Sequence, residues 1–360
     1  MPIRVLLVED SPVALVILKR ILSASPDIEV VGTAKTGYEA LELIPKVQPN
    51  VICTDLHMPQ MDGLELTKEV MSRYPRPILV ISASVQEEDT QNVFRLLEAG
   101  AVDILPKPRS GLAYESAAAR QELINKIKVL SGVSVFTQHR RLSSIPETRV
   151  ERKVTPQAVS PVSRPTQSQP YFGTVKMVTI GASTGGPQAL HTILTQIPPK
   201  FPVPVVCVQH ISEGFLQGLV DWLAVDCRLP VKIAEAGEFP KPGVIYFPME
   251  RRHLELDSQG RFKCTMSPPV GGHCPSVTVT FKAIARYYGR SSMGILLTGM
   301  GRDGAEGLLE MANAGALTIA QDEKSCVVFG MPKEAIALGA AKHVLPLPQI
   351  APMLLKQVIG

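Results

Sequence analysis

Hydrophobic and polar positions follow a repeating order along the first 108 residues. Short apolar runs of strand length alternate with stretches in which apolar residues recur every three or four positions, as in amphipathic helices. This order predicts five strand-helix units, and therefore a doubly wound, five-stranded parallel sheet with helices on both faces. The expected elements are 3–8, 12–23, 29–32, 37–44, 51–54, 63–72, 78–82, 86–98 and 102–105.

A second α/β pattern begins near residue 173. Its buried strands are expected at 175–180, 203–208 and 293–298, and helical spacing follows at 188–194 and 305–312. Between the two patterns, 115–130 has helical spacing, but 140–170 is rich in Pro, Ser, Thr, Gln and Arg and has no apolar period. We therefore predict a domain at 1–108, a linker at 109–172 that becomes flexible, and a second α/β domain with a mostly parallel sheet at 173–360.

Composition narrows the class of protein. Apolar residues make up 45% of the 360 residues and charged residues 19%, which excludes a disordered or fibrous chain. The net charge is +4, but the segment 109–170 alone carries ten Lys and Arg residues against four Glu residues. Because the basic charge belongs to the linker, we expect no nucleic-acid partner.

The six cysteines and the apolar runs indicate the compartment. No two cysteines form a C-x-x-C pair, and Cys53 and Cys207 lie inside apolar runs, as reduced structural thiols do. No apolar run is long enough to cross a bilayer, and the N-terminus has no signal-peptide pattern. We expect a cytoplasmic protein without membrane insertion.

Polar residues collect at the strand ends of the first domain. Glu9 and Asp10, then Asp55, Ser82 and Lys107 lie at the ends of four of the five predicted strands, and such ends meet at one edge of a parallel sheet. Three carboxylates there favour Mg²⁺, with Asp55 as a nucleophile toward phosphorus. Lys107 and the Ser82 hydroxyl are suited to the resulting phosphoryl group. A single aspartate after a strand usually caps a helix, but five polar residues in this order are hard to explain by capping.

The first domain resembles the receiver domain of two-component response regulators, which has a flavodoxin-like fold. The resemblance implies that Asp55 accepts a phosphoryl group from a histidine kinase. It also implies that Mg²⁺ is held by Glu9, Asp10, Asp55 and the main-chain carbonyl of His57. Ile104 departs from the pattern, because receivers often carry an aromatic switch residue there. The residues that carry the resemblance are Glu9-Asp10, the block from Asp55 to Gly63, Ser82-Ala83 and Lys107-Pro108.

A glycine-rich turn opens the second domain. The run from Gly181 to Pro187 follows an apolar strand and precedes a helix, so Ser183 lies on a sharp strand-to-helix turn. Helix N-terminal amides favour negative charge nearby, which suits a hydroxyl nucleophile. The same turn is also typical of a loop that cradles a phosphate.

Two further residues fit a catalytic triad with Ser183. His210 ends the next strand and lies 27 residues after Ser183, about one strand-helix step. Asp303 follows the strand at 293–298, in a second glycine-rich turn. A carboxylate there can orient the imidazole of His210, although it can also cap the helix at 305–312. Other histidines compete for the role of base: His191, His253, His343 and, as the strongest rival, His273 on a flexible loop.

The second domain resembles the CheB family of chemotaxis protein-glutamate methylesterases. The resemblance implies Ser183 as nucleophile, His210 as general base and then acid, and Asp303 as orienting carboxylate, with the Met300 main-chain amide in the oxyanion hole. It implies no cofactor in this domain. Cys274 departs from the pattern, because many members have a larger basic residue there. The matching motifs are Gly181–Pro187, Val208–His210, Gly271–Ser276, Leu297–Ala305 and Ala320–Glu323.

The two resemblances together predict function. The substrates would be γ-glutamyl methyl esters, and specific glutamines, on cytoplasmic helices of chemoreceptors. The unphosphorylated receiver is expected to dock over the Ser183 face and to leave it on phosphorylation of Asp55. One rival is a catalytically silent scaffold that binds receptors under receiver control. Another is a DNA-binding response regulator, but the second domain has no basic helix-turn-helix segment.

Overall fold

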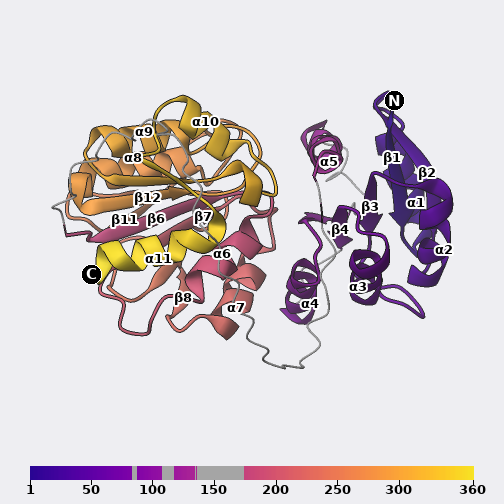
Figure 1. The fold of residues 1–360 in the computed structure, drawn as a ribbon, viewed down its shortest axis with the longest axis horizontal. Helices are drawn as coiled ribbons and strands as arrows, with labels where there is room; N and C mark the ends of the chain where they lie inside the picture. The colour runs from indigo at the N-terminus through magenta and orange to yellow at the C-terminus, as the bar shows by residue number, and fades with distance from the viewer. Residues whose placement is uncertain (83–86, 108–116, 134, 136–173) are drawn as a thin grey trace, which may run out of the picture.

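The computed structural model describes residues 1–82, 87–107, 117–133, 135 and 174–360. They form two α/β units, one built around each predicted sheet (Figure 1). Most of the predicted linker, including 140–170, lies outside the described residues. The predicted domain limits fall at or beside such residues and stay predictions.

The first unit is a five-stranded parallel sheet in the order β2-β1-β3-β4-β5. This arrangement confirms the doubly wound fold predicted from the apolar runs. The elements are β1 (Ile3–Val8), α1 (Pro12–Leu22), β2 (Ile28–Ala34), α2 (Gly37–Val47), β3 (Val51–Thr54), α3 (Gly63–Arg73), β4 (Ile78–Ser82), α4 (Glu87–Glu98), β5 (Asp103–Pro106) and α5 (Ala117–Leu130).

Successive strand residues of this sheet point to opposite faces and bury different helices. Leu6 belongs to the core that α2, α3 and α4 cover, whereas Leu7 belongs to the core under α1 and α5. Both side chains are fully buried. A parallel sheet covered on both faces requires such nearly continuous apolar strands, which explains why their sequence pattern shows no alternation.

The second unit has a seven-stranded sheet in the order β14-β13-β12-β6-β7-β9-β8, and every recorded strand pair in it is parallel. Between β9 and β12, the chain forms a separate antiparallel hairpin, β10-β11. The strands are β6 (Met177–Ala182), β7 (Val205–Gln209), β8 (Val231–Ile233), β9 (Ile245–Phe247), β10 (His253–Leu256), β11 (Phe262–Thr265), β12 (Ser292–Leu296), β13 (Leu317–Gln321) and β14 (His343–Leu345).

Helices cover both faces of the second sheet. One apolar core includes residues of α6, α7 and α11, and the other includes residues of α8, α9 and α10. The chain runs from β6 outward to β7 and later returns to place β12 on the other side of β6. Ligands in open α/β sheets bind at such a reversal of strand order. The helices are α6 (Gly186–Leu194), α7 (Leu216–Asp226), α8 (Val277–Tyr288), α9 (Ala305–Asn313), α10 (Met331–Ala337) and α11 (Leu347–Val358), with short 3₁₀ turns η1 (Gly289–Ser291) and η2 (Glu323–Ser325).

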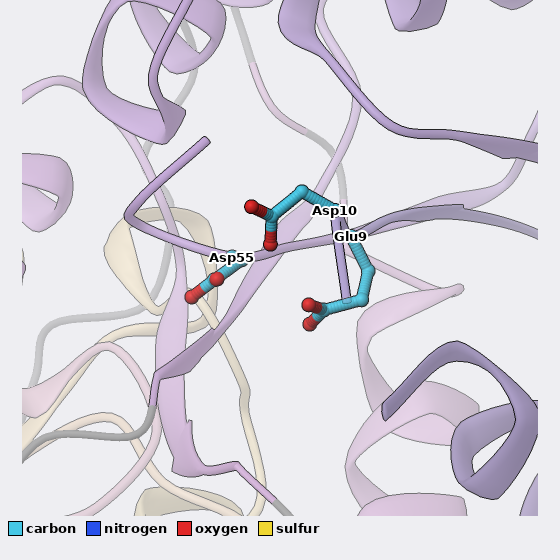
Figure 2. A group of neighbouring side chains, drawn as sticks. All are labelled: Glu9, Asp10 and Asp55. Carbon is cyan, nitrogen blue, oxygen red and sulfur yellow. The ribbon is translucent and has the colours of Figure 1, made fainter. Parts of the chain in front are cut away.

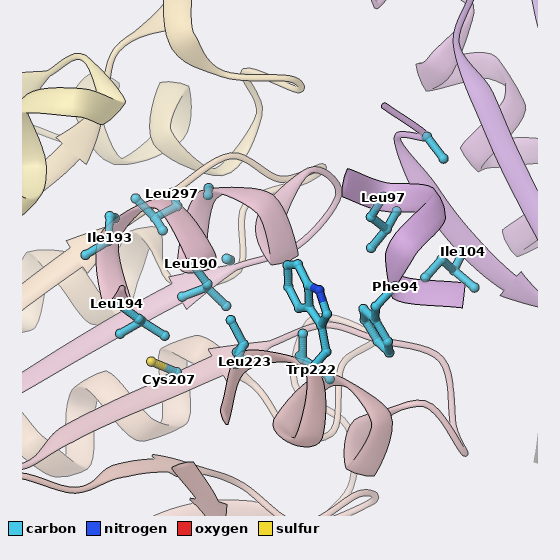
Figure 3. Close-up of a cluster of buried hydrophobic side chains, with 14 of the residues drawn as sticks. Phe94, Leu97, Ile104, Leu190, Ile193, Leu194, Cys207, Trp222, Leu223 and Leu297 are labelled. Atoms are coloured by element: carbon cyan, nitrogen blue, oxygen red, sulfur yellow. The ribbon is translucent and has the colours of Figure 1, made fainter. Parts of the chain in front are cut away.

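The two units touch through α4 of the first and α7 of the second. Phe94 and Trp222 stack with ring centroids 5.5 Å apart (Figure 3). The indole Nε1 of Trp222 donates to Glu98 Oε1 at 2.6 Å, and Gln188 Nε2 donates to the carbonyl of Ala101 at 2.8 Å. An apolar centre with satisfied polar groups around it is the usual anatomy of a specific interface.

Two other expectations can be compared with the structure. All six cysteines are free thiols. Burial raises the pKa of Cys53 to about 12, as expected of a structural thiol. In the described part of the chain, no helix has the length and apolar character needed to cross a membrane.

Candidate active site and acidic receiver site

Ser183 directly follows β6, between the ends of β7 and β12. Its amide donates to the carbonyl of Thr298 at 3.0 Å, and its carbonyl accepts from the side chain of Gln209 at 2.8 Å. Helix α6 begins three residues later, at Gly186. The side chain is buried, with 8% of the residue exposed. The turn is therefore held to both neighbouring strands by hydrogen bonds.

Gly299 lies against this turn. A methyl group at position 299 would come within 2.7 Å of Ser183 Cβ and 2.4 Å of Met331 Sδ. No real side chain tolerates such contacts without a shift of its neighbours. Only glycine at this position allows the turn after β12 to approach the serine so closely.

His210 and Asp303 form a hydrogen-bonded pair. His210 Nε2 lies 2.8 Å from Asp303 Oδ2, and the exposed fractions of the two side chains are 8% and 2%. His210 Nδ1 is buried and has no partner within the described part of the chain. Because β7 and β12 both pair with β6, the two residues flank the strand that Ser183 follows. The structure thus gathers all three predicted residues at one edge of the sheet.

The Asp303 carboxylate is bound by the first turn of α8. It accepts hydrogen bonds from the amides of Val277 and Thr278, at 2.7 and 3.0 Å, and from the Ser276 hydroxyl at 2.8 Å. Burial tends to raise the pKa of Asp303, but the hydrogen bonds and positive charge of His210 and the bonds from Thr278 outweigh it and hold the pKa well below its usual range. Asp303 is therefore a permanent anion at the N-terminus of α8.

This arrangement differs from the capping role considered for Asp303. Helix α9 begins after Gly304 without a side-chain cap. The carboxylate instead serves α8, a helix that begins 26 residues earlier in the chain.

Of the four competing histidines, only His273 stacks on His210 in the described structure. His191 contacts Asp226 and stacks on Trp222, and His343 begins β14. His253 accepts a hydrogen bond from the Ser276 amide through Nδ1. His273 does reach the site, as its loop allowed, but its ring stacks on His210, with centroids 3.7 Å apart. Asp303 is paired with His210, the histidine predicted as the base.

The stacked pair leads to a stability prediction. Burial, followed by the charge of His210, lowers the pKa of His273 to about 4. An unfolded histidine has a pKa near 6.5. As pH falls from about 6.5 to 4, position 273 therefore binds a proton in the unfolded chain but stays largely unprotonated in the folded chain. We expect His273 to contribute a loss of about 2 kcal/mol in unfolding free energy between pH 7 and pH 5.

Urea unfolding of the unaltered chain and of His273→Phe at both pH values checks this prediction. The variant has no group that titrates at position 273, so its loss of unfolding free energy should be smaller by that amount. Equal losses in both proteins would contradict it.

The turn after β12 also contains a main-chain amide, that of Met300, which could donate a hydrogen bond to a bound substrate. In the residue before it, the Gly299 amide donates to the carbonyl of Val328 and the Gly299 carbonyl accepts from the Met331 amide. No hydrogen bond from the Met300 amide occurs within the described residues. A preorganised, unpaired amide near a nucleophile is what an oxyanion hole requires.

Thr184, next to Ser183, is bound by the first unit. Its hydroxyl donates to Asp103 Oδ2 at 2.8 Å, and Lys126 of α5 pairs with the same oxygen at 2.5 Å. The position of Thr184 in the glycine-rich turn did not predict this contact. Asp103 lies on β5, the strand that leads to Lys107. The first unit therefore contacts the residue adjacent to Ser183 through an element of its own acidic site.

The acidic site lies at the strand ends of the first sheet. One carboxylate oxygen from each of Glu9, Asp10 and Asp55 lies within 4.8 Å of the other two (Figure 2). Lys107 Nζ lies 2.7 Å from both Glu9 Oε1 and Asp55 Oδ2. Ser82, at the end of β4, is buried beside them in the sheet, and its carbonyl accepts from the Lys107 amide at 2.6 Å. The five predicted residues thus follow the strands that meet at this edge.

This donor set fits a divalent cation. Burial raises the pKa of Glu9, although Lys107 and the Ser11 amide act against the shift. Glu9 Oε2 is buried and has no hydrogen-bond partner among the described residues. An orphaned carboxylate oxygen beside two further carboxylates suits Mg²⁺, which binds oxygen ligands. The role of the His57 carbonyl stays a prediction.

Three supporting residues were quoted in the sequence motifs without a role. Gln209 Nε2 donates to the carbonyls of both Ser183 and His210, at 2.8 Å each. Gln321 Oε1 accepts a hydrogen bond from the Thr298 amide at 2.8 Å, and the Ser276 hydroxyl donates to Asp303. Each is fully or almost fully buried. The one sequence signal was a polar residue at an otherwise apolar strand end or helix start, which does not reveal its partner.

Comparison with known proteins gives two family matches. Residues 178–354 match the family model of the CheB methylesterase, and residues 5–114 match that of the response regulator receiver domain. The chain is 40% identical over 358 residues to a protein-glutamate methylesterase/protein-glutamine glutaminase 1 of Syntrophus aciditrophicus, covering 98% of each chain. It is also 40% identical to a protein of the same activity name from Nitrosospira multiformis, covering 97% of this chain and 95% of the relative.

Among solved structures, the second unit is similar to the Thermotoga maritima CheB methylesterase catalytic domain. The two are 39% identical, with a TM-score of 0.50, and the match covers 51% of this chain and 98% of that domain.

Proposed function

The chain belongs to the CheB methylesterase family, and we propose that it is a phosphorylation-regulated protein-glutamate methylesterase and protein-glutamine deamidase. Its relatives carry both activities in their names. The observation that carries the proposal is the His210–Asp303 pair, which leaves His210 Nδ1 buried at the strand end next to Ser183, with no partner among the residues that the structure describes. A serine hydroxyl is the partner that such a nitrogen lacks.

The proposed reaction is acyl transfer in two steps. Ser183 Oγ attacks the γ-carbonyl carbon of the methyl ester, and its proton passes to His210 Nδ1. The tetrahedral intermediate collapses as His210 returns that proton to the departing methanol. Water then attacks the acyl-serine, again with His210 as base, and frees the glutamate and Ser183. With a glutamine substrate, ammonia leaves in place of methanol.

Asp303 and Met300 act on the charges that develop. Asp303 holds Nε2–H of His210, fixes the tautomer with a free Nδ1 and stabilises the imidazolium. The Met300 amide would donate to the oxygen of the tetrahedral intermediate. These two interactions are strongest in the transition state, which is where binding accelerates a reaction.

The proposed substrate is a receptor helix in the cytoplasm. Two exposed arginines of the second unit already have partners: Arg251 pairs with Glu213 at 2.5 Å, and Arg302 pairs with Glu306 at 2.6 Å. A cavity of about 80 Å³ lies beside His210, and its lining includes Ile211, Phe247 and Pro275. Its apolar part would accept a side chain that flanks the modified glutamate.

The receiver would control access to Ser183. A histidine kinase is the proposed phosphodonor for Asp55, and Lys107 would pair with the new phosphoryl oxygens. Mg²⁺ bound by Glu9, Asp10 and Asp55 would neutralise charge on the phosphoryl group. Phosphorylation would shift Lys107 away from its present partners and, through β5, disturb the contact of Asp103 with Thr184. The docked form would then give way to an open, active one.

The test is methanol release from methylated receptor membranes, with the intact chain in the presence and absence of acetyl phosphate and Mg²⁺. The proposal predicts release that rises at least about fivefold with acetyl phosphate, the lower end of typical coupling between sites. Methanol release that does not change with acetyl phosphate would support the esterase activity and contradict its regulation by phosphorylation. No release in either sample would support the receptor-binding scaffold instead.

Undocking can be followed by fluorescence, because Trp222 is the only tryptophan of the chain. It is 6% exposed and lies between the rings of Phe94 and His191. We expect acetyl phosphate and Mg²⁺ to shift its emission to longer wavelength, since undocking exposes the indole to water. Asp55→Asn should show no shift. Unchanged emission in a chain that mass spectrometry shows to be phosphorylated would contradict the proposed undocking.

A further inference from the structure

The rings of His210 and His273 are stacked face to face. Their planes differ by 3° and their centroids lie 3.7 Å apart. This contact uses only the ring faces of His210, so it leaves the ring edge free: Nε2 meets Asp303, and Nδ1 remains without a partner in the described part of the chain. The ring nitrogens of His273 make no hydrogen bond among the described residues. His273 is therefore placed to act on His210 by its face.

A tight hairpin turn presents His273 to the site. Val270 and His273 exchange two backbone hydrogen bonds of 3.1 Å. Between them, Gly271 and Gly272 have φ angles of 60° and 88°, which a two-residue type I′ turn requires at both central positions and which favours glycine. The local sequence thus directs the position of the His273 side chain.

The same segment also binds the carboxylate of the site. Three residues after His273, the Ser276 hydroxyl and the amide of Val277 donate to Asp303. One short stretch of chain therefore contacts both partners of the His210–Asp303 hydrogen bond. A displacement of this stretch would alter the orientation of the base and of the carboxylate together.

Only one ring of the stacked pair, that of His210, becomes positively charged during the proposed reaction. Two imidazolium rings at this distance would repel strongly, and His210, Asp303 and Lys126 are the charged or titratable groups that act on His273. With its pKa lowered to about 4, His273 stays neutral when His210 accepts a proton. A neutral aromatic face against a cationic ring is favourable.

We propose that His273 is a positioning residue for the reaction at Ser183: its neutral ring, stacked on His210, holds the imidazole in the plane in which Nε2 meets Asp303 and Nδ1 is available to the serine. This inference rests on the proposed function, because it takes His210 to be the general base. It assigns no bond to substrate and no proton transfer to His273.

The experiment compares three variants of the full chain in acetyl phosphate and Mg²⁺. His273→Phe keeps an aromatic face, His273→Leu keeps apolar bulk without one, and His343→Leu is the matched control at the start of β14. The measurements are kcat and KM for methanol release, the rate at which a fluorophosphonate probe labels Ser183, and the ring ¹H and ¹⁵N resonances of His210. Circular dichroism and urea unfolding establish that each variant is folded.

The proposal predicts that His273→Leu lowers kcat and the labelling rate about 10- to 100-fold with little change in KM, because a base displaced by less than 1 Å loses rates of this size. His273→Phe should stay within about threefold of the unaltered chain, and His343→Leu should match it. The His210 ring protons should move downfield in His273→Leu alone, because an aromatic neighbour no longer shields them.

Two results would overturn the proposal. One is an unchanged labelling rate and unchanged His210 resonances in His273→Leu. The other is an equal loss in His273→Phe and His273→Leu, which would assign a polar rather than a stacking role to His273. Failure of the proposed function is a different observation, namely no methanol from the unaltered chain, and the His210 resonances test the stack independently of it.

Discussion

Replacing Ser183 by alanine is expected to lower methanol release by about 10⁴- to 10⁶-fold, the range over which loss of a serine nucleophile abolishes acyl transfer. The change removes the hydroxyl group that is the nucleophile of the proposed mechanism. It should leave the turn intact, because the bonds that hold it use the main chain of Ser183. The measurement is methanol release from methylated receptor membranes in acetyl phosphate and Mg²⁺.

Ser212→Ala is the matched control. Ser212 lies two residues after His210, and its hydroxyl is buried without a hydrogen-bond partner among the described residues. This variant loses the same chemical group from the same region, and its activity should stay within about twofold of the unaltered chain. Activity of Ser183→Ala within tenfold of the unaltered chain would exclude Ser183 as the nucleophile.

Asp303→Asn is expected to lower kcat by about 10⁴-fold. An amide at position 303 can donate to His210 Nε2 and so favour the tautomer that carries its proton on Nδ1, where the serine needs an acceptor. The variant also weakens the cap of α8, because the NH₂ group of asparagine would place a donor opposite donors such as the Val277 amide. We expect this to cost about 1–3 kcal/mol of unfolding free energy.

The two effects of this variant can be separated. Asp322→Asn makes the same change at the end of the next strand, β13, where Asp322 caps η2 through the Ser325 amide. Because asparagine and aspartate cap helices about equally well, this variant should lose little stability and little activity. If both variants lose activity equally after correction for the folded fraction, Asp303 has no special role.

The charge of Asp303 sets the pH range of these comparisons. Its pKa is lowered in the folded chain, so the stability it contributes is present above the pKa of an unfolded aspartate, near pH 4, and is lost as pH falls further. At the neutral pH of the assay the carboxylate is ionised. The loss in Asp303→Asn therefore reflects the missing anion.

Much of the fold could be predicted because buried parallel strands have a simple sequence signature. The run at 3–8 and the four apolar runs that follow it appear as β1 to β5, in the parallel order expected of a doubly wound sheet. Glycine-rich turns after 175–180 and 293–298 predicted strand ends, and both are strand ends of the second sheet. Since such ends share one edge, the sequence also placed Ser183, His210 and Asp303 near one another.

Other features depend on contacts between distant segments. His273 was expected to compete with His210, but its ring lies on the face of His210, and a sequence does not distinguish a stacked imidazole from a hydrogen-bonded one. Asp303 was weighed as a cap for α9, but it binds the start of α8, because β12 brings the turn back beside that helix. The partner of a buried polar group is decided by packing, which here brings together residues 25 or more positions apart.

The contact between the units is the clearest case of this division. By itself, the sequence determined the two sheets, the strand-end residues of each and a linker between them, since apolar periodicity and turn residues act over a few positions. Only the tertiary structure decided that Asp103 meets Thr184 and that Trp222 stacks on Phe94. These pairs join surfaces whose complementarity arises after each unit has folded, and no local pattern in the chain records it.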